Sequence, residues 1–331
     1  MVCLPFTKYT WNRVSQWLEE HQKEYWSRVF PNYYQADGEL DIVIEKLIEY
    51  DRPYSAINYL GTMFHASKTV KVELCVQALL AALSGRESPQ NRDGYHIVAL
   101  IKFLQSEPSI SQEDLFKIEW AYLPLLNRYS KAAPKFLESR LANYPEFFCE
   151  VIRLVYRSTK ENQSTREDSE EVTTIATNAH RLLREWETPP GICDGGTFDA
   201  ELFNEWLKRV KTICTESGHL EVALINVGKV LIHAPADQNG LWIHQAVATA
   251  LNDHDAEDMR RGFRTEMYNS RGTHYVDPTG SPEKKLAEHF RRKAEDLEND
   301  GFHRFAVTLK NLANSYEQDA GRIIDENQQD E

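Results

Sequence analysis

Apolar residues recur at helical spacing along almost the whole chain, and no stretch alternates in the manner of a strand ladder. Positions i, i+3, i+4 and i+7 share one face of a helix, and three segments show this spacing clearly. They are Leu40, Val43, Ile44, Leu47 and Ile48; Val72, Val76, Leu79, Leu80 and Leu83; and Leu202, Phe203, Trp206, Leu207, Val210 and Ile213. Such helices must bury their apolar faces against one another, so the pattern predicts an all-α fold.

Turn and capping residues separate the predicted helices. In the first half the helices cover 10–28, 38–50, 53–65, 70–84, 93–106, 111–127, 134–142 and 145–157. In the second half they cover 171–187, 198–217, 219–234, 241–253, 255–269, 282–299 and 302–325. Ser111 followed by Asp114 resembles a capping box, and Asp37 can cap the helix that follows it. Gly301 suits the turn of the last hairpin.

The helices recur in pairs, with a period of ~35–40 residues that is typical of stacked helix-hairpin arrays. We find no tetratricopeptide or ankyrin consensus, so this prediction concerns the architecture and not a repeat family. We expect helical hairpins stacked as an irregular α-solenoid of the HEAT or TPR type, arranged in two lobes.

A polar segment divides the chain. Residues 158–171, STKENQSTREDSEE, contain no apolar side chain and therefore bury nothing. Burial is what offsets the entropy lost on ordering, so we expect an exposed polar linker here. The predicted organisation is an N-terminal helical array over 1–157, the linker, and a C-terminal helical domain over 172–331.

Composition and charge narrow the classes of partner. The chain has 331 residues, of which 11% are aromatic, and this is ample for packed cores. Its net charge of -13 opposes sequence-independent attraction to nucleic acid or to an anionic membrane, so we expect neither as a partner. The five cysteines lie far apart without C-x-x-C spacing, which indicates reduced and mostly buried thiols. Without a signal peptide or a long apolar run, the chain is expected to be cytoplasmic.

The sharpest cluster of metal-ligand types is His254, Asp255 and Asp258, at the start of one predicted helix. Imidazole and carboxylate groups bind transition metals, and His233 or His244 could complete a site of the His-Asp phosphohydrolase type. The competing interpretation is that these acidic groups stabilise a helix N-terminus. A metal-dependent hydrolase centred on this cluster is therefore the alternative function, and otherwise we expect no cofactor.

The densest basic stretch of the chain interleaves arginines with aromatic residues. Its members are Arg260, Arg261, Phe263, Arg264, Tyr268 and Arg271. Guanidinium groups match carboxylate or phosphate groups with two parallel hydrogen bonds, so we predict that these arginines and Tyr268 form a partner-binding surface. The alternative is internal ion pairing with Glu257, Asp258 and Glu266.

No catalytic motif is complete in the sequence. Cys193 lies in a glycine-rich loop, but no general base is specified near it. Gly228 and Lys229 lack the upstream glycine of a phosphate-binding loop. The leading prediction is therefore a non-catalytic helical scaffold that binds a protein partner.

Two stretches carry a resemblance. They are 116–158, which contains FKIEWAYLPLLNR and PKFLESRLANYPEFFCEVIRLVYRS, and 240–280, GLWIHQAVATALNDHDAEDMRRGFRTEMYNSRGTHYVDPTG. Both resemble the C-terminal α-helical region of large, poorly characterised bacterial multidomain proteins. The resemblance implies a sensing or docking region of a bacterial stress or defence system, which acts within or beside a longer protein that holds the enzymatic activity.

Overall fold

The protein is all-α in the part of the chain that the structure describes. The computed structural model describes residues 8–28, 37–89, 93–127, 132–160, 170–193, 195–273 and 275–329. Within these ranges no strand forms, and Ile192 and Phe198 make one isolated antiparallel bridge. The predicted all-α class is therefore confirmed. The residues pack as two compact units, Met1–Leu137 and Glu138–Glu331, which we describe separately.

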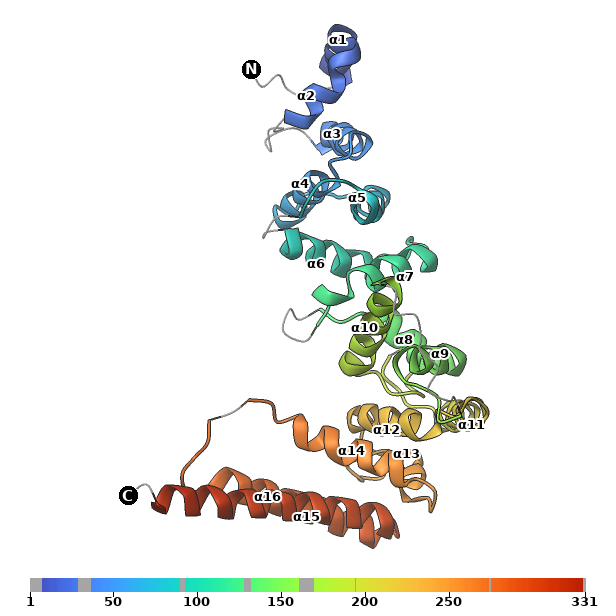
Figure 1. Cartoon of the computed structure of the whole chain (residues 1–331), viewed down its shortest axis with the longest axis vertical. Helices are drawn as coiled ribbons and strands as arrows, with labels where there is room; N and C mark the ends of the chain where they lie inside the picture. Colours follow the sequence, from blue (N-terminus) through green and yellow to red (C-terminus); the bar gives the residue numbers. More distant parts are fainter. Residues whose placement is uncertain are drawn as a thin grey trace. The chain divides into compact units, whose positions relative to one another are not determined.

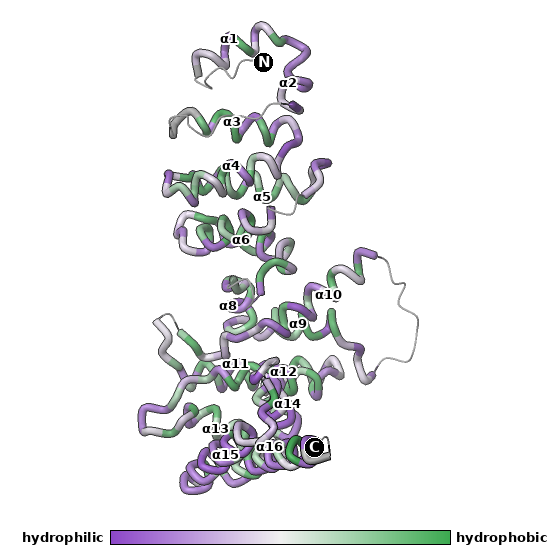
Figure 2. Tube along the Cα trace, turned by 90° about the vertical axis from the view of Figure 1, so that its left-hand side faces the viewer, coloured by the Kyte–Doolittle hydropathy of each residue, from purple (hydrophilic) through white to green (hydrophobic). Residues whose placement is uncertain are grey.

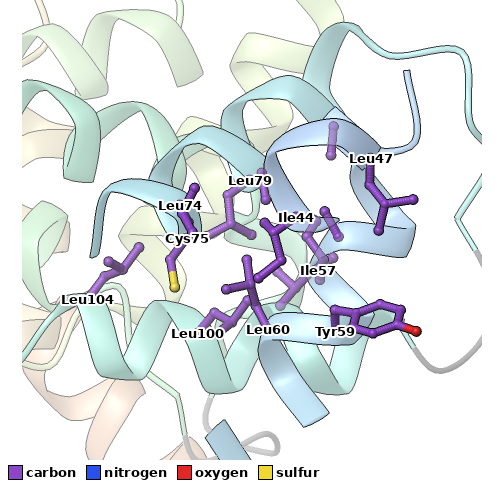
Figure 3. Close-up of a cluster of buried hydrophobic side chains, with 14 of the residues drawn as sticks. Ile44, Leu47, Ile57, Tyr59, Leu60, Leu74, Cys75, Leu79, Leu100 and Leu104 are labelled. Carbon is purple, nitrogen blue, oxygen red and sulfur yellow. The ribbon is translucent and has the colours of Figure 1, made fainter. Parts of the chain in front are cut away.

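The first unit is a set of short helices packed on their sequence neighbours (Figure 1). They are α1 (Lys8–Leu18), α2 (Gln22–Arg28), α3 (Asp37–Glu49), α4 (Pro53–His65), α5 (Val72–Ser84), α6 (Asp93–Leu104) and α7 (Gln112–Ala121). Figure 3 shows apolar side chains of α3, α4, α5 and α6 meeting in one cluster. Ile44, Leu60, Leu79 and Leu100 are completely buried in it, as the helical spacing predicts.

Local sequence sets several helix ends. The Oγ of Ser111 accepts a hydrogen bond from the backbone N–H of Asp114 at 3.1 Å, so the predicted cap of α7 is confirmed. Pro53 is buried in the first turn of α4, where its missing N–H costs nothing. The side chain of Asp37 lies outside the described residues, and so does Cys3.

Several predicted helices are shorter or broken in the structure. The helix predicted over 10–28 is interrupted by a 3-10 turn in which Glu19 has a positive φ of 44°. The helix predicted over 111–127 ends at Ala121, and a 3-10 turn containing Pro124 follows. The helix predicted over 241–253 begins only at Gln245, because the ring of His244 accepts a hydrogen bond from the N–H of Ala246 and caps it.

The second unit contains longer helices. They are α8 (Lys135–Asn143), in which the division between the units falls, α9 (Pro145–Val155), α10 (Glu170–Glu185), α11 (Ala200–Ser217), α12 (Leu220–Val230), α13 (Gln245–Asn252), α14 (Glu257–Asn269), α15 (Ser281–Asn299) and α16 (His303–Gln329). Figure 1 shows α15 and α16 side by side as the closing hairpin. Gly301 occupies its turn with φ 84°, as predicted.

The helices on both sides of the polar segment 158–171 belong to this second unit. Phe148 of α9 packs against Trp186 and Trp206, with ring centroids 5.4 and 5.1 Å away. Residues 161–169 lie outside the described residues. The compact units therefore divide at 137/138, whereas the sequence places the domain boundary at the polar segment, because the apolar face of α9 is covered by helices that follow that segment.

Helices α12 and α14 cross with their backbones in contact. A Cβ atom on Gly228 would lie 1.9 Å from the carbonyl oxygen of Met259, and one on Gly262 would lie 2.0 Å from that of Ile225. This close approach fixes α14, which carries the predicted basic stretch. No described helix combines the length and the apolar character needed to cross a bilayer. Figure 2 shows that α15 is largely hydrophilic, whereas α4 and α5 have long hydrophobic stretches.

Candidate binding groove between α14 and α16

Four arginines meet in a groove between α14 and α16, which we call the cationic groove. Its volume is about 420 Å³, and it is lined by Glu257, Arg260, Arg261, Arg264, Arg304, Val307, Thr308 and Asn311. On each helix these positions follow the spacing i, i+3, i+4 and i+7, so each helix presents one continuous face to the groove.

The positions of the two helices are fixed by contacts behind the groove. Phe263 of α14 and Phe305 of α16 are completely buried and meet edge to face, with their ring centroids 5.1 Å apart. The side-chain oxygen of Asn252, at the end of α13, accepts a hydrogen bond of 2.8 Å from the N–H of Arg304. Arg304 is therefore held at the first turn of α16, facing α14.

Arg260 is partly buried and contacts uncharged groups. Its guanidinium donates to the carbonyl oxygens of Leu251 and Asp253, at 2.8 and 2.6 Å, at the end of α13. Burial holds the pKa of Arg260 below its usual value against the opposing effect of the Glu257 and Asp253 carboxylates, and the positive charge of Arg304 lowers it further. Arg260 is therefore close to both like and opposite charges in this groove.

Arg261 forms ion pairs within the molecule. It lies 2.7 Å from a carboxylate oxygen of Glu221 on α12 and 3.1 Å from one of Asp258. These carboxylates balance its charge and connect α14 to α12. For this residue the alternative prediction of internal ion pairing describes the observed contacts.

Arg264 and Arg304 are both exposed at the groove. Among the described residues, neither guanidinium has a carboxylate within salt-bridge distance or a side-chain hydrogen bond. Val307 lies beside them with 52% of its surface exposed. The groove therefore combines two available cations with an exposed apolar side chain, in a protein whose net charge is -13.

Tyr268 and Arg271 lie away from the cationic groove, although the sequence groups them with it. The hydroxyl of Tyr268 donates to a carboxylate oxygen of Asp319 at 2.6 Å. Arg271 forms an ion pair of 2.7 Å with Glu283, whose side chain is only 2% exposed. Both line a separate cavity of about 490 Å³ beside the loop that precedes α15. The structure thus brings together Arg260, Arg261 and Arg264, and places Tyr268 and Arg271 in internal contacts elsewhere.

The residues of the predicted metal cluster do not converge. The ring of His254 and the carboxylate of Asp255 lie 2.8 Å apart on the surface, while Asp258 faces Arg261. His244 serves as the cap of α13. In the part of the chain that the structure describes, no group of three histidine, cysteine or acidic side chains could hold a metal ion.

Arg304, Val307, Thr308 and Asn311 were not predicted as site residues. Their spacing was visible as one face of the last helix, but an isolated polar face has many uses. Only the tertiary structure shows that this face lies opposite Arg264.

Comparison of the chain with protein-family models, with curated proteins and with solved structures finds no match.

Proposed function

We propose that this protein is a non-catalytic helical scaffold that binds an acidic segment of a partner protein in the cationic groove. The observation that carries the proposal is the pair of exposed guanidinium groups, Arg264 and Arg304, with which no described carboxylate forms an ion pair, although Glu257 lines the same groove. A carboxylate supplied by a partner would form the charge-assisted hydrogen bonds that these groups lack.

The contrast between the negative net charge of the chain and the arginines of the groove supports this proposal. The chain carries 51 acidic and 38 basic residues, so its net charge of -13 opposes association with acidic partners in general. A groove with available guanidinium groups would attract an acidic partner locally. Such complementarity directs a partner to one orientation and makes association dependent on salt.

The shape of the groove supports a peptide as the occupant. It runs between two helices, as grooves for peptide segments do, and exposed Val307 offers an apolar contact next to the charges. Thr308 and Asn311 supply further hydrogen-bonding groups along the same face of α16. In this proposal the helices form an irregular solenoid-like stack whose task is to present the groove. The assignment to a bacterial stress or defence system rests on the sequence resemblance alone.

The test compares charge reversals in and outside the groove. Arg264→Glu and Arg304→Glu reverse the two available charges, and Arg292→Glu reverses an exposed arginine of α15 outside the groove. A fluorescent polyglutamate peptide serves as a defined acidic probe. We expect wild-type and Arg292→Glu to bind it and to release it in high salt, and each groove variant to bind roughly tenfold more weakly.

Stability must be measured on the same samples. Because Arg264 and Arg304 are exposed, the melting temperatures of the two groove variants should stay within about 2 °C of that of the wild-type protein. Equal binding by all four proteins would overturn the groove assignment. Equal weakening by Arg292→Glu would show that only net charge matters, and would overturn it as well.

A further inference from the structure

Two buried cysteine side chains face each other between α9 and α11. The sulfur atoms of Cys149 and Cys214 lie 3.4 Å apart, although the residues are 65 positions apart in the sequence. Both residues are completely buried and both are free thiols. A disulfide bond has a sulfur–sulfur length of about 2.05 Å, so the two sulfur atoms must approach each other by about 1.4 Å to bond.

Contacts on both sides of the thiols hold the two helices together. One helical turn before Cys149, Glu146 forms an ion pair of 2.7 Å with Arg209 of α11. Beyond the end of α9, the Oγ of Ser158 and the Nζ of Lys160 donate to carbonyl oxygens at the end of α11. The helices are therefore held in register without a covalent link, with the two thiols already side by side.

The two thiols of the pair differ in their electrostatics. The neighbouring thiol of Cys149 holds the pKa of Cys214 below its usual value although burial raises it, and the positive charge of Arg153 lowers it further. Cys75, by contrast, is buried alone, and burial raises its pKa to about 12. A cavity of about 310 Å³ opens beside the Glu146–Arg209 pair, one helical turn from Cys149, but neither cysteine lines it, so a peroxide reaches the thiols only through local opening of the packing.

We propose that Cys149 and Cys214 form an oxidisable dithiol that closes to an intrachain disulfide on reaction with a peroxide. The thiolate of Cys214 attacks a peroxide oxygen, the O–O bond breaks, and the leaving hydroxide takes up the proton that the Cys214 thiol had lost, so that a sulfenic acid and one water form. The thiol of Cys149 then attacks the sulfenic sulfur, the S–O bond breaks, and a second water leaves. Two thiols lose two hydrogen atoms in total, and one hydrogen peroxide is reduced to two waters.

The disulfide would join α9 covalently to α11 and close the loop that contains α10 (Figure 1). A cross-link of this kind restricts the unfolded chain more than the folded one. Oxidation therefore adds a covalent link to a packing contact of the second unit. A thiol reductant restores the buried dithiol.

The experiment treats the purified, reduced, full-length protein with hydrogen peroxide, alkylates the remaining thiols and maps the peptides without reduction. We expect a peptide pair joined through Cys149 and Cys214, and a mass lower by two hydrogen atoms. The cross-linked protein should melt roughly 5 °C higher than the reduced protein, and dithiothreitol should reverse both changes.

Cys193→Ser is the matched control, because it removes a half-buried thiol outside the pair. It should retain the cross-link, whereas Cys149→Ser and Cys214→Ser should lose it. The wild-type protein is its own control for folding, since the same sample is compared before and after oxidation. Oxidation of the pair only to sulfinic or sulfonic acids, a linkage through another cysteine, or an unchanged melting temperature after linkage would each overturn the proposal.

Discussion

Arg271 and Glu283 form an ion pair that is largely removed from water. The side chain of Glu283 is 2% exposed and that of Arg271 is 20% exposed, with 2.7 Å between them. The pair fastens the loop after α14 to the first turn of α15. Arg271→Ala would remove the Arg271 cation from this buried carboxylate, so we expect a loss of about 3 kcal/mol in the free energy of unfolding. Urea denaturation followed by circular dichroism measures this loss.

Arg292→Ala is the matched control for this change. Arg292 pairs with Glu288 at 3.9 Å, and both side chains are about two-thirds exposed. Exposed pairs at this distance contribute little, so the free energy of unfolding should change by less than about 0.5 kcal/mol. Equal losses for the two variants would show that burial of the Arg271–Glu283 pair has no consequence for stability.

Asp237 gives the stability a defined dependence on pH. Its two carboxylate oxygens accept hydrogen bonds of 2.9 Å from the N–H groups of Asn239 and Gln245. These bonds hold the pKa of Asp237 below its usual value. The unfolded chain therefore takes up this proton first, and protonation favours unfolding. The stabilisation is present above the unfolded pKa of about 3.9 and is lost as the pH falls through the native pKa.

Asp237→Asn isolates this contribution. The amide keeps the shape of the side chain, but its nitrogen cannot accept a hydrogen bond, so we expect a loss of about 1 kcal/mol at neutral pH. Unfolding free energies of both proteins, measured from neutral pH down to the lowest pH at which they fold, should converge as the pH falls. A difference that stays constant over this range would contradict the role of the charge.

At the scale of single residues, the sequence predicted contacts between residues that are close to each other along the chain. The capping pair Ser111 and Asp114 is separated by three positions, and its geometry follows from the helix itself. The partners of the arginines are not local. Arg261 pairs with Glu221, 40 positions away, and nothing near Arg261 in the sequence indicates this contact. The prediction could therefore name the arginines without separating internal contacts from available charges.

At the scale of helices, the crossing of α12 and α14 depends on two glycines. Gly228→Ala and Gly262→Ala would each place a Cβ atom within about 2 Å of a backbone carbonyl oxygen, which cannot move aside as a flexible side chain can. The helices must separate, so we expect each variant to lose about 3 kcal/mol or more of folding free energy. Melting temperatures measured by circular dichroism, together with soluble yield, give the result.

Gly321→Ala is the control for these substitutions. Gly321 lies in α16, and no atom lies within 4 Å of the place its Cβ would take. Alanine has the higher helix propensity, so the variant should be as stable as wild-type or more stable by up to about 1 kcal/mol. If all three variants behaved alike, the effect would belong to helix propensity and not to the crossing.

The sequence predicted where helices lie better than how they meet. Apolar spacing located most helices to within a few residues, because burial of one face is a local pattern. The same sequence presented Gly228 only as part of an incomplete phosphate-binding motif. In the structure Gly228 lies where two helices touch, together with Gly262, which is 34 positions later. The sequence of either helix alone does not indicate this contact.

At the scale of the whole molecule, the polar segment and the packing suggest different divisions. The absence of apolar residues over 158–171 indicates a boundary, but α9 precedes this segment and packs on α10 and α11 that follow it. The position of the polar segment along the chain therefore does not determine which helices pack together. A polar segment shows where the chain need not be buried, whereas the cores show which helices stay together.

Cleavage of the chain inside this segment tests whether the helices on its two sides form one packed unit or two independent domains. A recognition sequence for a site-specific protease, inserted between Gln163 and Ser164, allows complete cleavage of the folded protein in the presence of a reductant. Because Phe148 packs on Trp186 and Trp206, the two fragments should remain together in gel filtration and keep the helical signal. In urea they should separate. Fragments that part in native buffer would instead show that the polar segment joins independent domains and that the contacts of α9 are too weak to hold the unit together.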